Sequence, residues 1–205
     1  DDLVSCYKKE IDALYKAGCR YIQLDDTNLA YLCDPKMRAG ARERGDDPDE
    51  LPKTHAQLIN RVIDGRPDDL TMAIHLCRGN YRSTWFAEGG YEPVAEILFS
   101  QINVDAYFLE YDDERSGDFA PLRYVPENKI VVLGIISSKI PQLENMADLT
   151  KRIDEASQYI PLDNLCVSPQ CGFSSTHHGN VLTEDDQWRK LELVVNTART
   201  VWGES

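Results

Sequence analysis

Side chains that can bind a metal ion follow several apolar segments of this sequence. His75 and Cys77 end the segment T-M-A-I-H-L-C, and the chain turns directly after them. Glu110 ends the segment A-Y-F-L-E, and Cys171 lies in the stretch S-P-Q-C-G-F. Together they offer one imidazole nitrogen, one carboxylate oxygen and two sulfurs, a donor set that suits Zn2+ in tetrahedral coordination. The sequence therefore contains a candidate zinc site.

The same four residues also have structural explanations. A buried cysteine often fills a core, and a buried histidine is often satisfied by local hydrogen bonds. Cys171 could pack at a turn, and Glu110 could form a salt bridge with Arg115 or Arg123. Spacing alone leaves both the metal site and these explanations open.

Strand geometry favours a shared site. Side chains at positions i and i+2 of a strand point to the same face, so His75 and Cys77 should point together and Leu76 away from them. Asp25 and Asp26 end a further apolar segment, Y-I-Q-L-D-D. In folds with parallel sheets, sites form at the carboxyl ends of the strands, and in a barrel these side chains would face the axis.

The elements that would position these residues alternate along the chain. Helical spacing of apolar residues alternates with short apolar runs that are typical of buried parallel strands. A stretch rich in Pro, Gly, Arg and Asp, residues 34–53, shows no period and is expected to be a long loop. The expected helices are 3–17, 54–64 (capped by Thr54), 92–101, 146–159 and 183–202, and the expected strands are 21–25, 71–77, 106–110, 129–136 and 165–168.

This alternation predicts an α/β protein with a parallel sheet. A doubly wound sheet and a (β/α)8 barrel both fit, but no G-x-G-x-x-G follows any expected strand, which weakens a dinucleotide-binding fold. Five strand–helix units are present where a barrel needs eight, and the chain opens on a helix. We therefore expect a TIM-type barrel of which this chain holds about the last five units, without the first strands.

Composition narrows the class of protein. The chain has 205 residues, 42% of them hydrophobic, and a formal net charge of -13. This charge argues against binding to nucleic acids or anionic membranes, because their phosphates would repel it. No apolar run is long enough for a membrane helix, and the first residues do not resemble a signal peptide. We expect a cytoplasmic protein whose cysteines are free or metal-bound.

The other cysteines and histidines are less informative. Four cysteines are expected to be structural: Cys6, Cys19, Cys33 and Cys166. His55 is expected on a helix surface. His177 and His178 follow a Ser/Thr-rich stretch and are expected on a loop, where a metal or proton-transfer role is the less favoured alternative.

The motifs H-L-C-R-G-N, F-L-E-Y-D-D and S-P-Q-C-G-F, with I-Q-L-D-D upstream and R-T-V-W-G at the end, resemble the catalytic domain of cobalamin-independent methionine synthase. The resemblance covers residues 3–203 and is greatest to the short, single-barrel members of the family. It implies a (β/α)8 barrel whose zinc is held by His, Cys, Glu and Cys. In this sequence the matching residues are His75, Cys77, Glu110 and Cys171.

The resemblance also implies a reaction. The family transfers a methyl group from a 5-methyltetrahydrofolate, usually polyglutamylated, to the thiol of homocysteine, giving methionine. Zinc holds that thiol as a thiolate, and the residue that matches the family's homocysteine-binding aspartate is Asp25. Because a tertiary amine is a poor leaving group, the donor nitrogen must be protonated by a nearby acid.

The sequence departs from the family on the donor side. The family motif D-E-P is replaced by Asp25-Asp26-Thr27, and an acidic residue associated with folate is replaced by Tyr31. The proton-donating histidine is expected near residues 136–138, where the chain reads I-S-S followed by Lys139, so no catalytic proton donor is assigned. Alternatives are therefore a different donor such as methylcobalamin, alkyl transfer to a different thiol, or a zinc-binding relative without catalysis.

Overall fold

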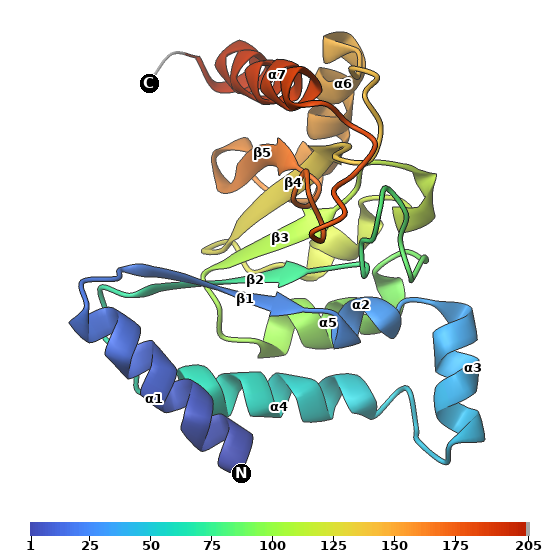
Figure 1. Ribbon diagram of the computed structural model, residues 1–205. Helices are drawn as coiled ribbons and strands as arrows, with labels where there is room; N and C mark the ends of the chain where they lie inside the picture. Colours follow the sequence, from blue (N-terminus) through green and yellow to red (C-terminus); the bar gives the residue numbers. More distant parts are fainter. Residues whose placement is uncertain (204–205) are drawn as a thin grey trace.

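The computed structural model describes residues 1–203 and alternates helices with parallel strands (Figure 1). The strands form one sheet whose spatial order follows the chain, so each crossover leads to the next strand. A doubly wound sheet would reverse direction at a switch point, whereas a TIM-type barrel keeps sequential order. The prediction of five consecutive barrel units is confirmed. The strands are β1 (Tyr21–Asp26), β2 (Thr71–Leu76), β3 (Ala106–Glu110), β4 (Ile130–Ile136) and β5 (Leu165–Pro169).

Helices cover one face of this sheet. Helix α1 packs on α4, α4 on α5, and α6 on α7, which also contacts β5 (Figure 1). The last helix begins with a capping box, in which the side chains of Thr183 and Asp186 each bond the other's backbone. The helices are α1 (Asp2–Lys16), α2 (Asn28–Tyr31), α3 (Pro35–Glu43), α4 (Leu51–Ile63), α5 (Glu92–Gln101), α6 (Met146–Ser157) and α7 (Glu184–Trp202), with short 3-10 turns at Glu114–Ser116, Ala120–Tyr124 and Leu162–Asn164.

The two faces of the sheet have different roles. Ile74 and Leu76 are fully buried and belong to the hydrophobic core, as do Tyr107 and Leu109 on the next strand. Their neighbours along each strand point to the opposite face, because side chains alternate across a strand. His75 and Leu76 therefore point to opposite faces of the sheet, as predicted. The polar residues gather on the face away from the helices.

The prediction of a long loop at residues 34–53 is wrong. Helix α3 occupies 35–43, and α4 begins at Leu51 rather than after Thr54. The buried Asp34 caps α3, since its carboxylate accepts hydrogen bonds from the backbone N–H groups of Lys36 and Met37. A proline at the first helical position, Pro35, completes this start signal. Glycine and charged residues inside α3 hid its period.

Gly134 marks a close approach between strands β4 and β5. A Cβ added there would lie 2.9 Å from the carbonyl oxygen of Leu109 and 3.0 Å from the Cα of Gln170. The pairing of β4 with β5 also shifts register between Gly134 and Ile136. The missing side chain lets the backbone that leads to Cys171 pass close to the end of β3, where Glu110 is paired with Gly134.

All six cysteines are free thiols, as expected for this sequence. Cys33 is buried, whereas Cys6 and Cys166 are exposed and do not fill the core. Cys166 is aligned with Val132 on β4, on the polar face of the sheet.

Strands β1 and β5 are the two edges of the described sheet. Beside β1, a largely apolar groove of about 780 Å3 runs between α1 and α4, and Leu3 and Tyr7 are exposed along it. Within residues 1–203, no helix combines the length and apolar character needed to cross a membrane.

Candidate metal centre

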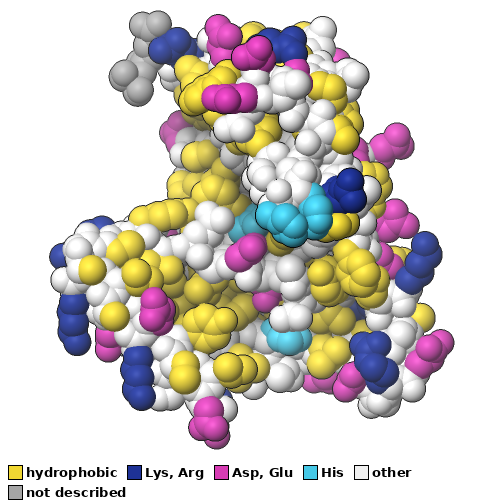
Figure 2. All heavy atoms as spheres, viewed as in Figure 1, with side chains coloured by type: hydrophobic (Ala, Val, Ile, Leu, Met, Phe, Trp, Pro, Cys, Tyr) yellow, Lys and Arg dark blue, Asp and Glu magenta, His cyan; other side chains and the backbone are white. Residues whose placement is uncertain are grey.

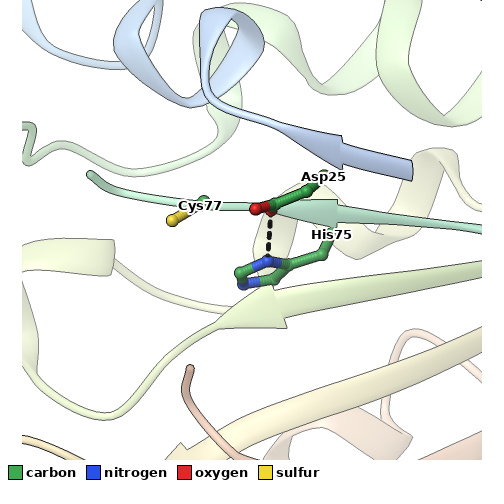
Figure 3. Close-up of side chains that lie close together, drawn as sticks. All are labelled: Asp25, His75 and Cys77. Atoms are coloured by element: carbon green, nitrogen blue, oxygen red, sulfur yellow. Dashed lines mark hydrogen bonds and ion pairs between the residues drawn. The ribbon is translucent and has the colours of Figure 1, made fainter. Parts of the chain in front are cut away.

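The structure brings the predicted ligands to one edge of the sheet. Atoms of His75, Glu110 and Cys171 that could bind a metal all lie within 4.8 Å of one another. A second group within the same limit joins His75 to Cys77 and Asp25 (Figure 3). Cys77 and Cys171 thus each lie in one of the two groups, and His75 belongs to both. Asp25 and Cys171, the outermost of these residues in the sequence, are 146 positions apart. They come to the same region because parallel strands end at the same edge of the sheet.

His75 is buried between two carboxylates. Its Nδ1 lies 2.8 Å from Oδ1 of Asp25, and its Nε2 lies 3.2 Å from Oε1 of Glu110. Burial works to lower the pKa of His75, but these two hydrogen bonds outweigh it and raise the pKa to about 10. Both ring nitrogens of the metal-free protein therefore donate, Nδ1 to Asp25 and Nε2 to Glu110. A metal ion would replace the proton on Nε2, while the bond from Nδ1 to Asp25 would keep the ring in the tautomer that a metal-binding histidine needs.

Glu110 is completely buried at the end of β3. Oε1 accepts a hydrogen bond from Asn80 at 2.9 Å, and Oε2 accepts one from Gln170 at 2.5 Å. Arg115 places Nη2 3.6 Å from Oε2, which is the salt bridge considered from the sequence. Burial works to raise the pKa of Glu110, but the bond from His75 and the other nearby donors and cations lower it overall. The carboxylate is thus held ionised, as a metal ligand must be.

The thiols of Cys77 and Cys171 differ in proton affinity. The hydrogen bond from Cys171 lowers the pKa of Cys77 to about 6 although burial opposes it, and the same bond raises the pKa of Cys171. One thiolate is therefore already favoured, and a cation would favour the second. Asn80 adds a polar contact, with Nδ2 3.7 Å from Sγ of Cys77.

This donor set fits zinc. Zinc bonds of about 2.0–2.3 Å in a tetrahedron separate neighbouring ligand atoms by roughly 3.3–3.8 Å. The triad of His75, Glu110 and Cys171 already falls within 4.8 Å, so small side-chain rotations would close it. Cys77 lies within the same limit of His75 in the second group and would supply the fourth ligand. Two thiolates and one carboxylate would give the zinc-loaded site a charge of about -1.

The two acidic residues that end β1 have different surroundings. Asp26 accepts a hydrogen bond from the backbone N–H of Leu29 at the start of α2, and burial raises its pKa. Asp25 has a side chain that is 67% exposed and still contacts His75. It therefore lies at the rim of the site, open to a ligand, and its role in substrate binding stays a prediction.

Two supporting residues, Asn80 and Gln170, were not found from the sequence, and a third, Lys139, was noted only beside the expected position of the proton donor. Gln170 and Asn80 bond to each other and to Glu110. Lys139 is buried, contacts Oε1 of Gln170 and lies 3.7 Å from Oδ2 of Asp112. Gln170 lies inside the motif S-P-Q-C-G-F, and Asn80 ends the motif H-L-C-R-G-N. Both are therefore sequence neighbours of predicted ligands, but an amide side chain at these positions does not by itself indicate a role at a metal site.

His177 and His178 lie on the loop between β5 and α7, as expected. Their ring centroids lie 3.7 Å apart with the rings tilted by 38°, and His178 packs edge-on against Tyr81. Neither belongs to the two metal-binding groups found among the described residues. Figure 2 shows histidine side chains near the centre of the face seen in Figure 1, between the α1–α4 side and the α6–α7 side. His55 lies on α4 beside the groove, partly buried rather than fully exposed.

The loop that carries these histidines is hydrogen-bonded to the loops that follow β2 and β4. Asn180 accepts a hydrogen bond from the backbone N–H of Ser83 at 3.1 Å and donates one to the carbonyl of Ser138 at 2.9 Å. The hydroxyl of Ser83 in turn accepts from the N–H of Val181. Ser83 has a φ of 64°, a left-handed conformation that is unusual for a non-glycine residue. These bonds hold the segment after Cys77 against the segment after Cys171.

Comparisons with known proteins show the family of this chain. The family model for the catalytic domain of cobalamin-independent synthase matches residues 1–199. The chain is 52% identical to YxjH, an uncharacterized Bacillus subtilis protein, over 98% of this chain and 54% of that protein. It is 26% identical to a methionine synthase from Pyrococcus horikoshii, over 83% of this chain and 42% of that protein.

A solved structure is similar over nearly the whole chain. It is the crystal structure of a Listeria monocytogenes protein assigned as a vitamin-B12-independent methionine synthase, with a TM-score of 0.77 and 44% identity. The similarity covers 99% of this chain and 55% of that one. The chain therefore spans about half the length of the relatives it matches.

Proposed function

Because this chain belongs to the family of the cobalamin-independent methionine synthase catalytic domain, we propose that it carries the zinc site of a homocysteine S-methyltransferase. The observation that supports this proposal is a pair of ligand groups at one edge of the sheet that share His75. One group joins His75 to Glu110 and Cys171, and the other joins it to Cys77 and Asp25. The product would be methionine, and the substrates would be homocysteine and a methyl donor.

Hydrogen bonds from neighbouring side chains set the orientation and protonation of the candidate ligands. Asp25 accepts from Nδ1 of His75, which turns Nε2 inward. Metal binding would have to displace the proton on Nε2 of His75 and the thiol proton that the pair of Cys77 and Cys171 still holds. Bound zinc would keep the homocysteine sulfur deprotonated and therefore nucleophilic at neutral pH. The exposed oxygen of Asp25 would hold the ammonium group of homocysteine at the rim.

The methyl donor is the less constrained part of the proposal. A 5-methyltetrahydrofolate needs an acid that protonates the departing nitrogen as the carbon–nitrogen bond breaks. Tyr31, which packs against Phe86, stands where the family has an acidic residue, and Ser137 and Ser138 stand where a histidine is expected. Lys139 is buried and already engaged by Gln170 and Asp112. These observations favour testing a methylated corrinoid as a second donor.

Residues 3–203 would form the second part of a barrel that another segment completes. The edges β1 and β5 and the apolar groove beside β1 are the surfaces that such a segment would cover. The relatives are about twice as long as this chain, which leaves enough residues for three further strand–helix units.

Zinc stoichiometry tests the metal site directly. We expect about one zinc per 205-residue chain by elemental analysis and loss of that zinc in Cys77→Ser. Cys166→Ser is the matched control, because Cys166 lies on the same face of the sheet but outside the ligand groups. Equal zinc content in parent and Cys77→Ser would remove the proposed site.

Methyl transfer is tested with paired donors. A zinc-loaded protein of the relatives' full length that contains this chain should form methionine from homocysteine with methyltetrahydrofolate or with methylcobalamin. Product with only one donor identifies that donor. Bound zinc without product from either donor would refute the methyltransferase proposal and favour a zinc-binding protein without catalysis.

A further inference from the structure

Gln170 connects the end of β5 to the end of β3. It is buried, and its Nε2 donates to Oε2 of Glu110 at 2.5 Å and to Oδ1 of Asn80 at 3.0 Å. Its Oε1 accepts from Nζ of Lys139 and from the hydroxyl of Ser138 at 3.1 Å. The amide therefore uses both of its donors and both of its acceptor positions inside the protein.

The direction of this amide is set by Lys139. A glutamine side chain can flip and exchange its oxygen and nitrogen, which would turn an oxygen toward the Glu110 carboxylate and repel it. An ammonium group has only donors, so Lys139 requires that Oε1 faces it and thereby turns Nε2 toward Glu110. Asp112, 3.7 Å from Nζ, balances the buried charge of Lys139.

The backbone of Gln170 is fixed independently of this network. Its N–H donates to the carbonyl of Ile136 at 2.8 Å, and its Cα lies against Gly134. The next residue is Cys171. One short segment thus supplies a candidate ligand and also holds another candidate ligand that comes from a different strand.

We propose that Lys139 and Gln170 form a positioning pair, in which the lysine fixes the direction of the amide and the amide fixes the carboxylate of Glu110 for metal binding. The inference rests on the metal site proposed above. Neither residue binds the metal itself. Groups that orient metal ligands typically change metal affinity about 10–100-fold when removed.

A second explanation is that Lys139 acts only through its charge, which would offset the negative charge of the loaded site without involving Gln170. The two explanations differ in how the substitutions combine. If Lys139 acts through the amide, its removal matters only while Gln170 is present. If Lys139 acts only through the electrostatic field of its charge, its removal lowers zinc affinity by the same factor in the parent protein and in the Gln170 variant.

The experiment measures zinc affinity by chelator competition, together with the visible absorption spectrum of the Co2+-substituted protein. The variants are Gln170→Met, Lys139→Met and the double variant, with Gln57→Met and Lys151→Met as controls on exposed helix surfaces. Circular dichroism of each metal-free variant confirms folding. Lys139→Arg keeps a donor toward Oε1 and should retain most of the affinity if Lys139→Met itself proves poorly folded.

We expect Gln170→Met to weaken zinc binding about 10–100-fold and to shift the Co2+ spectrum. Lys139→Met should weaken binding in the parent but by less than about two-fold in the Gln170→Met background. Zinc affinity of folded Gln170→Met within about two-fold of the parent, or equal effects of Lys139→Met in both backgrounds, would overturn the inference. Failure of the parent itself to bind zinc would instead refute the metal site.

Discussion

Oδ1 of Asp25 lies 2.8 Å from Nδ1 of His75, across the parallel pairing that aligns these two residues on β1 and β2. Figure 3 shows this contact from one strand to the next, with Cys77 beyond it. A carboxylate bonded to one nitrogen of an imidazole fixes the tautomer and leaves the other nitrogen for a metal. Asp25 is therefore placed to orient His75, and its role with substrate stays a prediction.

Replacing Asp25 with alanine should lower zinc affinity about 10–100-fold, because the ring of His75 would lose its orienting acceptor. Asp25→Asn should lower it less, since the amide oxygen can still accept from Nδ1. Chelator competition measures both, and Asp2→Ala on the surface of α1 is the control. Unchanged zinc affinity together with a raised KM for homocysteine would restrict Asp25 to substrate binding.

Gly134→Ala should destabilise the protein by about 1–3 kcal/mol, because the added Cβ would overlap the carbonyl of Leu109 and the Cα of Gln170. Urea unfolding followed by circular dichroism measures the change. Gly172→Ala is the matched control, since a Cβ there meets no atom within 4 Å. Equal stability of the two variants would show that the strands can separate at Gly134 without cost.

Asn180→Ala should loosen the loop between β5 and α7 by removing its bonds to Ser83 and Ser138. We expect faster hydrogen exchange in residues 172–182 and a loss of global stability of about 1–3 kcal/mol, from a few hydrogen bonds at about 1 kcal/mol each. Ser174→Ala removes only a local bond to Thr176 and serves as the control. Unchanged exchange in this loop would contradict the fastening role of Asn180.

Iodoacetamide should distinguish the cysteines. Cys6 is exposed and should react readily, whereas burial raises the pKa of Cys33 to about 12 and leaves almost no thiolate near pH 8. We expect Cys33 to react at least about 100-fold more slowly, because the thiolate is the reacting form. Added zinc should protect Cys77 and Cys171 but leave labelling of Cys6 unchanged, as mass spectrometry would show. Labelling of Cys77 at the same rate with and without zinc would count against the proposed ligand set.

Most elements were predictable because their apolar periods are local. The five strands and the helices ending at Lys16, Gln101 and Trp202 match their predicted positions within a residue or two. Helix α3 was missed because its interior contains Gly40 and several charges, although the pair Asp34-Pro35 is a recognisable start signal. The ends of helices depend on such caps more than on periodicity, so the start of α3 is encoded by Asp34 and Pro35 although its interior lacks a clear period.

The sequence by itself determined the residue types at the strand ends, the alternation that turns His75 and Cys77 to one face, and the family resemblance that nominated four zinc ligands. Only the tertiary structure decided which partners prepare those ligands. Asp25 reaches His75 through strand register, and Lys139 reaches Glu110 through Gln170. The reason is physical: alternation and capping act within a few residues, whereas these contacts depend on how separate strands are paired and how closely Gly134 lets two of them approach.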